Sequence, residues 1–568
     1  MEGGFRRFAA ALGAVSSVVL TSLTVASAAF GVDYEVRFVA DIDPGPASGL
    51  SSVSSARAGD RFVFTATTSA GGEEPWVTDG TTAGTRQLAD IMPGPGGSGA
   101  FAYASYNGKV FFAASDPVNG YEPWITDGTP AGTTLLANIN PGSASSSPLP
   151  AGVMGGKLYF LANNPATGRE FWTVDPSFNV ASAPEMVPGA GSLSPDRAFS
   201  VGDSIYFSGS DGVSGREPWT YNGASATQLQ NIAPGIGSSN PTNELALDGV
   251  FFFIANDGGG SQIWRSTGSG ATKVTNGPGD VQSAGFPLNG RLMFGAFAPA
   301  TGFELYSASI APTPLGPATL VKDIAPGATA GGPSAVVPVG GGLGLFGAND
   351  GVTGTEVWRT DGTTAGTTLV SNENPTGSGV ASGMTKLTEG VAMYVGNDGA
   401  TGFEPFITDG TAQGTKPIAD IVPGASPSNP TIPGSGFNLD GKQLFGATTP
   451  ERGRELYIAE PVDKTAPTLT VKADGKAKKG LVRLTATCDE TCTLGATGKT
   501  KKKIKLASEG AEATAAQPTS LKVSAKGKAK RKLKKLLKGK GKAKIKVTVT
   551  ATDAAGNAAS EALTVKAT

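Results

Sequence analysis

The chain has 568 residues, of which 82 are glycine and 39 are proline, and it contains no histidine. This length exceeds one ordinary hydrophobic core, so several domains or a repeat array are expected. Without histidine, Ser-His-Asp and Cys-His nucleophilic arrangements and His-containing zinc sites are excluded. Two cysteines cannot build an all-cysteine zinc site, so no transition-metal centre is predicted.

Charge is distributed unevenly along the chain. Residues Lys464 to Thr568 contain 25 Lys and Arg and 7 Asp and Glu, a net charge of +18. The other residues contain 21 basic and 40 acidic side chains, a net charge of −19, which returns the overall −1. We therefore expect an acidic front part joined to a strongly basic C-terminal domain.

The first 28 residues have the pattern of a secretory signal peptide. Arg6 and Arg7 precede an apolar run from Phe8 to Leu20, and small residues follow up to Ala28. A membrane anchor is the weaker alternative, because the run is short and is interrupted by Ser and Gly. No later segment is long and apolar enough to span a bilayer, so we predict no transmembrane segment and a secreted, extracellular or cell-surface location. The Arg pair leaves the export route open.

A unit of about 48 residues repeats between residues 34 and 460. Its landmark is an acidic residue two positions before an aromatic one, as in Glu74 and Trp76, and it recurs nine times at intervals of 42 to 52 residues, with Gln262 in one copy. An Asp-Ile-x-Pro-Gly string, first seen at Asp41, keeps the same register. Self-similarity at a fixed period indicates a repeat architecture.

Each unit has the pattern of four short strands. In one unit Arg216–Tyr221 and Ala226–Ile232 are the first two, and in the next unit Glu244–Leu247 and Val250–Ala255 are the third and fourth. Turn signals such as Asn222-Gly223 and Asp248-Gly249 separate them. The last strand is apolar on both faces, as expected for a strand packed between neighbouring sheets. The pattern predicts an all-β fold, a β-propeller-like ring of about nine four-stranded repeats.

The two ends of the array complement each other. The last unit stops at Glu455–Glu460 and lacks its final strand, whereas Glu35–Gly45 has the sequence of such a strand. An N-terminal strand that completes the last repeat would close the ring and remove its open edges. An open solenoid, or two smaller arrays, is the alternative architecture.

The repeat strings EPWVTDGTTAGT, EPWITDGTPAGT, EVWRTDGTTAGT and EPFITDGTAQGT resemble the ELWxxDGT repeat of bacterial secreted and surface proteins. The resemblance covers residues 34–460, and it implies no catalytic residue. Two copies depart from the pattern, since RSTG follows Trp264 and TVDP follows Trp172. The signature positions are Glu74, Trp76, Asp79, Gly80, Glu122, Trp124, Asp127, Gly128, Glu217, Trp219, Glu356, Trp358, Asp361, Gly362, Glu404, Asp409 and Gly410.

We interpret these signature residues as structural. The Asp-Gly pair suits a turn in which the carboxylate accepts backbone hydrogen bonds and Gly takes a positive φ. The Trp is expected to pack between blades, and the Glu to accept donors from a neighbouring unit. Calcium bound by the Asp-rich turns is one alternative, and a carbohydrate-active hydrolase with paired carboxylates is another. Nine equivalent copies define no unique catalytic pair, and we predict no cofactor.

Residues 461–467 form a predicted linker and residues 468–568 a basic domain of about seven strands. The strings DKTAPTLTV and TVTATDAAGN resemble bacterial Ig-like domains, which implies a β-sandwich. Cys488 and Cys492 lie close enough in sequence for a local disulfide, and two unpaired thiols are the alternative.

The run from Lys526 to Lys546 is the most basic segment of the chain. It suits a short amphipathic helix or a solvated connector. Polyanion-binding candidates are Lys530, Arg531, Lys532, Lys534, Lys535 and Lys538. Expected partners are an anionic cell-envelope polymer or glycan, or the acidic repeat domain itself. Few aromatic residues accompany the lysines, so no specific nucleic-acid binding is predicted.

Together these patterns predict a secreted protein that is not an enzyme and that mediates interaction or adhesion at the cell envelope. The basic domain would hold to anionic surfaces. The alternatives are the hydrolase with paired carboxylates and a purely structural surface protein, and the oligomeric state stays open.

Overall fold

The computed structural model describes residues 33–568 except 51–54, 187–192, 276–279, 283–284, 311–317, 328–329, 433–436, 463–465, 478–480, 541, 554–556 and 568. The predicted signal peptide, residues 1–28, lies outside the described residues. Regular structure in the described part is almost entirely β, with strands β1 to β44 and the helix α1. No helix in this part is long and apolar enough to cross a membrane.

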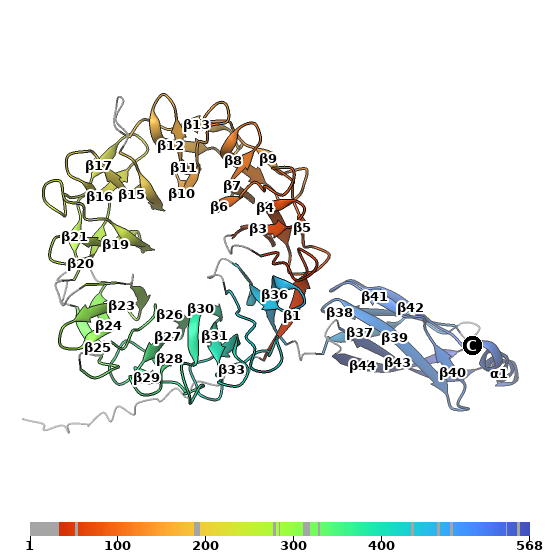
Figure 1. The fold of residues 1–568 in the computed structure, drawn as a ribbon. Helices are drawn as coiled ribbons and strands as arrows, with labels where there is room; N and C mark the ends of the chain where they lie inside the picture. Colours follow the sequence, from red (N-terminus) through yellow and green to blue (C-terminus); the bar gives the residue numbers. More distant parts are fainter. Residues whose placement is uncertain are drawn as a thin grey trace, which may run out of the picture.

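The described residues before the linker form nine four-stranded antiparallel sheets, arranged around a common axis (Figure 1). We number them in chain order. Sheets 1 to 4 are β2–β5 (Ser55–Ala58, Arg61–Thr68, Gly72–Thr78, Arg86–Gln87), β6–β9 (Phe101–Tyr106, Lys109–Asp116, Gly120–Thr126, Thr134–Leu135), β10–β13 (Leu149–Met154, Lys157–Asn164, Gly168–Val174, Val180–Ser182) and β14–β17 (Asp196–Val201, Ser204–Ser210, Arg216–Tyr221, Ala226–Gln228). Sheets 5 to 8 are β18–β21 (Thr242–Leu247, Val250–Asn256, Ser261–Ser266, Thr272–Lys273), β22–β25 (Phe286–Leu288, Arg291–Ala298, Gly302–Ser309, Thr319–Lys322), β26–β29 (Val337–Gly340, Leu343–Asn349, Thr355–Thr360, Thr368–Leu369) and β30–β33 (Val380–Thr388, Val391–Asn397, Phe403–Thr408, Lys416–Pro417).

Sheet 9 combines strands from opposite ends of this region. Strands β34 (Asn438–Leu439), β35 (Lys442–Thr449) and β36 (Gly453–Pro461) are joined by β1 (Tyr34–Ala40). Strand β1 pairs antiparallel with β36, from Tyr34 opposite Pro461 to Ala40 opposite Leu456. It thus occupies the outer position that the fourth strand takes in the other eight sheets.

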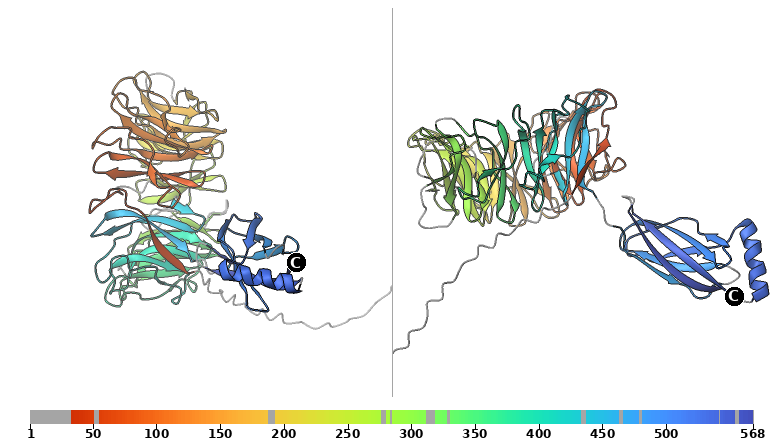
Figure 2. Two further views of the ribbon diagram at one scale, coloured as in Figure 1. Left: turned by 90° about the vertical axis from the view of Figure 1, so that its right-hand side faces the viewer. Right: turned by 90° about the horizontal axis from the view of Figure 1, so that it is seen from below.

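The core of this region is distributed over the interfaces between adjacent sheets. The second strand of each unit supplies much of it, because residues such as Val110–Ala114 in β7 are fully buried on both faces. Trp219 packs with Phe171 in a cluster shared by sheets 3 and 4. An equivalent cluster joins sheet 9 to sheet 1, where the Phe62 and Phe437 rings stack with centroids 5.3 Å apart. Seen from the side, the sheets form a single tier (Figure 2).

The predicted four strands per unit are present. Strand β18 begins two residues earlier and β19 ends one residue later than predicted, and the largest difference is at β17. Strand β17 ends at Gln228, whereas the sequence predicted a strand as far as Ile232. The reason is that the Ile232 amide donates a 2.9 Å hydrogen bond to the Glu217 carboxylate, so this segment is used as a connection to the next sheet.

The C-terminal residues form two antiparallel sheets and one helix. The smaller sheet contains β37 (Leu469–Ala473), β38 (Val482–Cys488) and β42 (Thr519–Val523). The larger contains β39 (Cys492–Thr500), β40 (Lys505–Ala507), β41 (Ala511–Ala513), β43 (Ala543–Thr552) and β44 (Ala558–Ala567). Residues of both sheets share one hydrophobic cluster, and Leu533 of helix α1 (Gly527–Lys540) is buried in it. A disulfide joins Cys488 at the end of β38 to Cys492 at the start of β39.

Candidate functional site

The repeated Glu is a buried carboxylate that accepts hydrogen bonds from backbone amides. Glu122 is fully buried in β8 and accepts from the amides of Ile139 at 2.9 Å, Asn140 at 3.3 Å and Ser146 at 3.0 Å. The Ser146 hydroxyl donates a further 2.7 Å bond. These donors lie in the connection that leads to the next sheet. The carboxylate therefore ties the third strand of one unit to the start of the following unit.

A buried Glu that accepts hydrogen bonds from backbone amides recurs in eight of the nine sheets, and seven of the eight follow one of two versions. The carboxylates of Glu74, Glu122, Glu217 and Glu404 receive both the amide and the hydroxyl of a serine. Those of Glu304, Glu356 and Glu455 receive the amide of a glycine instead. Glu170 accepts from the Met186 amide. In the remaining sheet Gln262 takes this place and accepts from the Thr275 hydroxyl.

Burial changes the acidity of these groups. Desolvation raises the pKa of Glu74, Glu122, Glu304, Glu356 and Glu404, against the hydrogen bonds that favour the carboxylate. The pKa of Glu455, in the sheet that contains both ends of the array, is raised to about 7. Desolvation is the largest cause, and the neighbouring Asp41 carboxylate acts in the same direction.

The Thr-Asp-Gly-Thr string forms a turn whose polar groups bond to one another. Asp127 accepts from the amide and the hydroxyl of Thr129 at 2.9 and 2.6 Å, and these bonds lower its pKa. Gly128 has a φ of 82°, a left-handed conformation that favours glycine. At Gly132, a Cβ would lie 2.1 Å from the Asp127 carboxylate, which explains the second glycine of the string.

These turns also connect neighbouring sheets. The carbonyl oxygen of the turn glycine accepts a hydrogen bond from an arginine of the preceding sheet, from Arg37 to Gly80 at 3.1 Å and from Arg359 to Gly410 at 3.3 Å. The carboxylates of the Asp-Gly turns, which were the alternative calcium ligands, already accept hydrogen bonds from backbone amides of their own turn. Asp350, for example, accepts from the amides of Val352 and Thr353. No group of three potential metal ligands occurs among the described residues.

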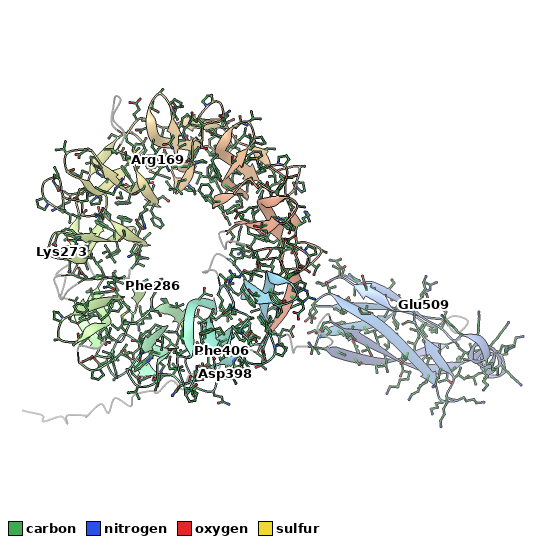
Figure 3. All side chains as sticks on the ribbon, in the orientation of Figure 1. Arg169, Lys273, Phe286, Asp398, Phe406 and Glu509 are labelled. Atoms are coloured by element: carbon green, nitrogen blue, oxygen red, sulfur yellow. A yellow bond between two sulfur atoms is a disulfide. The ribbon has the colours of Figure 1, made fainter. Side chains whose placement is uncertain are left out.

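The structure thus accounts for the signature residues through contacts that hold the repeats together. Trp219 and Trp358 are buried between adjacent sheets, and the four turn aspartates, Asp79, Asp127, Asp361 and Asp409, bond to the threonine two residues on. Figure 3 shows the side chains of this region, with Phe406 within the wall of sheets. None of these residues forms a recognisable ligand site in the part of the chain that the structure describes.

The predicted polyanion-binding residues all lie on helix α1. Lys530, Arg531, Lys532, Lys534, Lys535 and Lys538 are exposed there. Leu533 is buried, and Leu536 and Leu537 pack against the same core. Residues Gly527–Lys540 of the basic run therefore form an amphipathic helix that covers one end of the two sheets, as Figure 2 shows, and Lys544 and Lys546 of the run lie in β43.

A second group of lysines lies on the outer face of the larger sheet. Two of its members, Lys544 and Lys546, end the basic run that begins at Lys526, but none is among the predicted polyanion-binding residues. Buried and exposed side chains alternate along strand β43. Ile545, Val547 and Val549 are buried, whereas Lys544 and Lys546 are exposed. Its neighbours bring further lysines into register. Lys499 lies opposite both Lys505 of β40 and Lys546 of β43, and Lys544 lies opposite Lys566 of β44. These five residues form two rows across the strands, which we call the lysine rows.

Spacing in the lysine rows follows from sheet geometry. Neighbouring strands are about 4.8 Å apart, and residues two apart on one strand are separated by roughly 6.6 Å. Like charges directly opposite each other on adjacent strands are destabilising, by roughly 0.2–1 kcal/mol a pair. No carboxylate in the described residues forms an ion pair with Lys499, Lys505 or Lys546. The fold therefore holds these cations together without a counter-charge.

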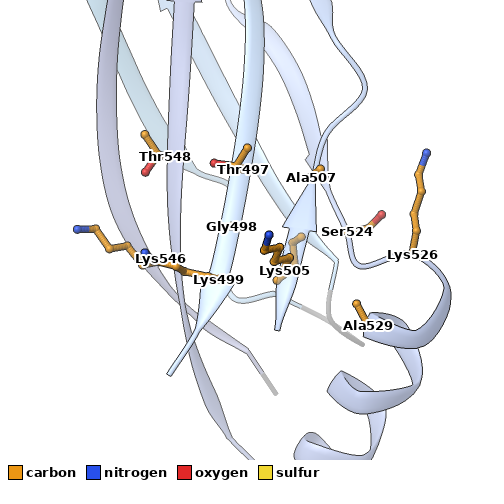
Figure 4. A pocket seen from close by; sticks show the side chains of 11 residues that line it. Thr497, Gly498, Lys499, Lys505, Ala507, Ser524, Lys526, Ala529, Lys546 and Thr548 are labelled. Atoms are coloured by element: carbon orange, nitrogen blue, oxygen red, sulfur yellow. The ribbon is translucent and has the colours of Figure 1, made fainter. Parts of the chain in front are cut away.

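Two pockets adjoin the lysine rows. The larger, of about 670 Å³, lies between β39, β40, β43 and the segment that leads into α1. Lys499, Lys505, Lys526 and Lys546 line it, together with Thr497 and Thr548 (Figure 4). Only Lys526 among these lysines has an ion pair in the described structure, with the exposed Glu509 labelled in Figure 3. The smaller, of about 310 Å³, is lined by Lys476, Lys542, Ala543, Lys544 and Lys566.

The chain is similar in fold to several solved structures. A puromycin hydrolase is 14% identical over 62% of this chain and 60% of its own length, with a TM-score of 0.34. An acylaminoacyl peptidase from Pyrococcus horikoshii is 12% identical over 51% of this chain and 48% of its own, with a TM-score of 0.29. The β-propeller domain of the Trilobed protease from Pyrococcus furiosus is 12% identical over 46% of this chain and 96% of its own, with a TM-score of 0.23.

No protein-family model and no curated protein sequence matches the chain. The chain spans about 60% of the length of the puromycin hydrolase. All three solved structures come from hydrolytic enzymes, which contradicts the prediction that the protein is not an enzyme. The predicted role in non-enzymatic adhesion at the cell envelope is contradicted on the same ground, and the hydrolase alternative agrees better with these findings. Identities of 12–14% describe a likeness of fold, so no catalytic residue is transferred to this chain.

Proposed function

We propose that the protein binds an anionic polymer through its basic C-terminal domain. The observation that carries this proposal is the set of lysine rows, where cations lie opposite one another and no carboxylate among the described residues pairs with Lys499, Lys505 or Lys546. An exposed array of like charges attracts a ligand of opposite charge and is stabilised when that ligand neutralises it. The exposed cations of α1 extend the same electrostatic field over one end of the domain.

The residue types on this surface support recognition by charge rather than by stacking. Residues 464–568 contain no Phe, Tyr or Trp, so no base or sugar ring can stack on an aromatic side chain there. Their basic residues are 23 lysines and only two arginines, Arg483 and Arg531. Lysine binds anions as a point charge, whereas arginine supplies the bidentate fork that reads base edges and carboxylates.

We also propose a fold for each of the two regions and a location for the protein. The repeat region is a nine-bladed ring of the ELWxxDGT kind, closed by β1, and the C-terminal domain is an Ig-like β-sandwich. The protein is secreted after removal of residues 1–28, so its ligand is an extracellular anionic polymer. Pairing of β1 with β36 supports the closed ring, and two antiparallel sheets around one core support the sandwich.

A truncation series tests the proposal. The full-length protein and a variant that ends at residue 463 are applied to a polyphosphate or heparin resin over a range of salt concentrations. We expect retention of the full-length protein to fall steeply with salt and the truncated variant to elute at once. Equal retention of both proteins, or retention that does not depend on salt, would overturn the proposal.

The same preparations also test the hydrolase alternative. Release of soluble fragments from the bound polymer, or of peptides from a general protease substrate, is measured over time for the full-length and truncated proteins. Product formed by both proteins would place a hydrolytic activity in the repeat region, separate from polymer binding.

A further inference from the structure

We infer that the lysine rows and the pocket beside them are a binding site for a linear chain of phosphate groups that runs across strands β40, β39 and β43. This inference rests on the proposed function and narrows it in two ways. It places the site on the sheet face rather than on helix α1, and it identifies phosphate as the charged group of the ligand.

The sheet face is a better-formed site than the helix. Backbone pairing fixes the positions of Lys499, Lys505 and Lys546 relative to one another, because each belongs to a paired strand and sits in direct register. On α1 the basic residues point outward around much of the helix, since only the leucine side is buried. A rigid row of cations binds a regularly charged chain without first having to be ordered.

The pocket adds hydroxyl donors beside the cations. Thr497 and Thr548 lie opposite each other on β39 and β43. Each is two residues from a lysine on the same strand, Lys499 or Lys546, and therefore lies on the same face of the sheet. Ser524 and Lys526 border the other side of the pocket, from the segment that leads into α1 (Figure 4). Ammonium and hydroxyl groups together supply several single donors from different directions. That set suits a tetrahedral oxyanion, which offers acceptors on all sides.

The surroundings of the rows favour a thin chain as the ligand. The outer face beyond them carries small side chains, such as Ala562 opposite Thr548 and Ser560 opposite Thr550. This part of the sheet can approach a ligand closely, and it offers no aromatic surface for bases or sugars. The second pocket, around Lys544 and Lys566, continues the basic surface to the edge strand β44. A chain crossing the sheet thus meets cations on four successive strands.

Two variants of equal charge separate the sheet face from the helix. The first replaces Lys499, Lys505 and Lys546 by Thr, which suits exposed strand positions and matches the neighbouring Thr497 and Thr548. The matched control replaces Lys530, Lys534 and Lys538 of α1 by Gln, a good helix former. Binding of the full-length proteins to inorganic polyphosphate is measured by titration calorimetry at several salt concentrations, with heparin and duplex DNA as competing probes.

We expect the sheet variant to lose at least about tenfold in polyphosphate affinity and the helix variant less than about threefold. We also expect the slope of log affinity against log salt to fall by about 2 to 3 in the sheet variant, since each lost phosphate contact removes about 0.7–0.9. Without ligand, the sheet variant should melt at the same or a higher temperature, because like charges are removed. A loss of binding with unchanged melting therefore reports on the site.

Other outcomes overturn the inference in distinguishable ways. Equal losses in both variants would mean diffuse attraction to the whole domain, so the assigned site is wrong while the proposed function stands. A stronger dependence on the three sheet lysines for heparin or DNA than for polyphosphate would mean that the ligand class is wrong. No binding of any of the three polymers by the unmodified protein would overturn the proposed function as well.

Discussion

The two parts of the molecule place their charged side chains in opposite surroundings. In the repeat region each signature Glu is buried, and backbone amides donate to its carboxylate, as at Glu122. In the C-terminal domain Lys499 and Lys546 are exposed and face each other, and no carboxylate in the described part of the chain forms an ion pair with either. A repeated charge that is buried and fully bonded serves the fold. A group of exposed like charges weakens the fold slightly, and it is there that a ligand is to be sought.

The largest expected effect comes from removing one buried carboxylate. Glu122→Ala leaves the Ile139 and Asn140 amides without their acceptor, and it takes one of two acceptors from the Ser146 amide and hydroxyl, which also donate to the Tyr121 carbonyl. Buried donors without partners cost about 1–3 kcal/mol each, so we expect a loss of roughly 4 kcal/mol or more in unfolding free energy. Chemical denaturation followed by tryptophan fluorescence measures this loss. A matched Lys530→Ala variant should be unchanged, and a loss below about 1 kcal/mol for Glu122→Ala would contradict the structural role.

The pH dependence of stability gives the next effect. The pKa of Glu455 in the folded protein is about 7, above its ordinary value of 4.5, so the folded state holds this proton between pH 4.5 and 7 and the unfolded state does not. Stability contributed by this group is therefore present below pH 4.5 and is lost as pH rises towards 7, by up to about 3 kcal/mol. The other raised glutamates act in the same direction.

Denaturation midpoints at pH 5 and pH 8, at constant ionic strength, test this dependence. Glu455→Gln has no proton to lose and should show a shallower decline. Constant or rising stability over this range would show that the amides of Ile42 and Gly49, which favour the carboxylate, outweigh its burial.

A smaller effect is expected for the disulfide. Replacing Cys488 and Cys492 by Ser opens a loop of five residues and removes a bond inside the core of the C-terminal domain. Loop entropy for so short a loop predicts a loss of about 2 kcal/mol. Calorimetry should show a lower melting temperature for the C-terminal domain alone. A shift in the transition of the repeat region as well would mean that the two parts unfold together.

The smallest effect has the opposite sign and sharpens the contrast between the two regions. Replacing Lys499 and Lys546 by Thr removes two directly opposed pairs, Lys499 with Lys505 and Lys499 with Lys546, so we expect a gain of a few tenths to about 1 kcal/mol at low salt. Salt screens the repulsion, and the gain should vanish at about 1 M. A loss of stability at low salt would show that these lysines contribute to the fold.

Much of the repeat region follows from sequence pattern. Buried runs such as Val250–Ala255 mark the second strand of each unit, and the missing strand after Glu460 indicates where β1 pairs. The partners of the signature Glu could not be predicted, because they are backbone amides distant in the sequence, as Ile139 and Ser146 are for Glu122, 17 and 24 residues further along. Every residue except proline has a backbone amide, so the residue type does not reveal which amide donates to the carboxylate.

The candidate site was harder to predict than the fold. The dense run on α1 drew attention in the sequence, whereas the lysine rows combine residues about 50 positions apart, such as Lys499 and Lys546. Polar and apolar residues alternate from Lys544 to Thr550 in the sequence, and this pattern predicts a strand with one exposed face that carries the lysines. Its register against β39 and β40 comes from tertiary pairing and had to be seen in the structure.

Because sheet 9 combines strands from both ends of the repeat region, it is the last sheet of this region that can form during synthesis of the chain. Strand β1 is made at Tyr34–Ala40, but its partner β36 is complete only at Pro461. At typical synthesis rates of 5–20 residues per second, about 20 to 90 s separate the two strands. During that time Val36 and Phe38 have no strand to pair with, and eight sheets can assemble before the ninth. Release of the chain from synthesis or transport before Pro461 would leave an unpaired strand at each end of the array, open to another chain.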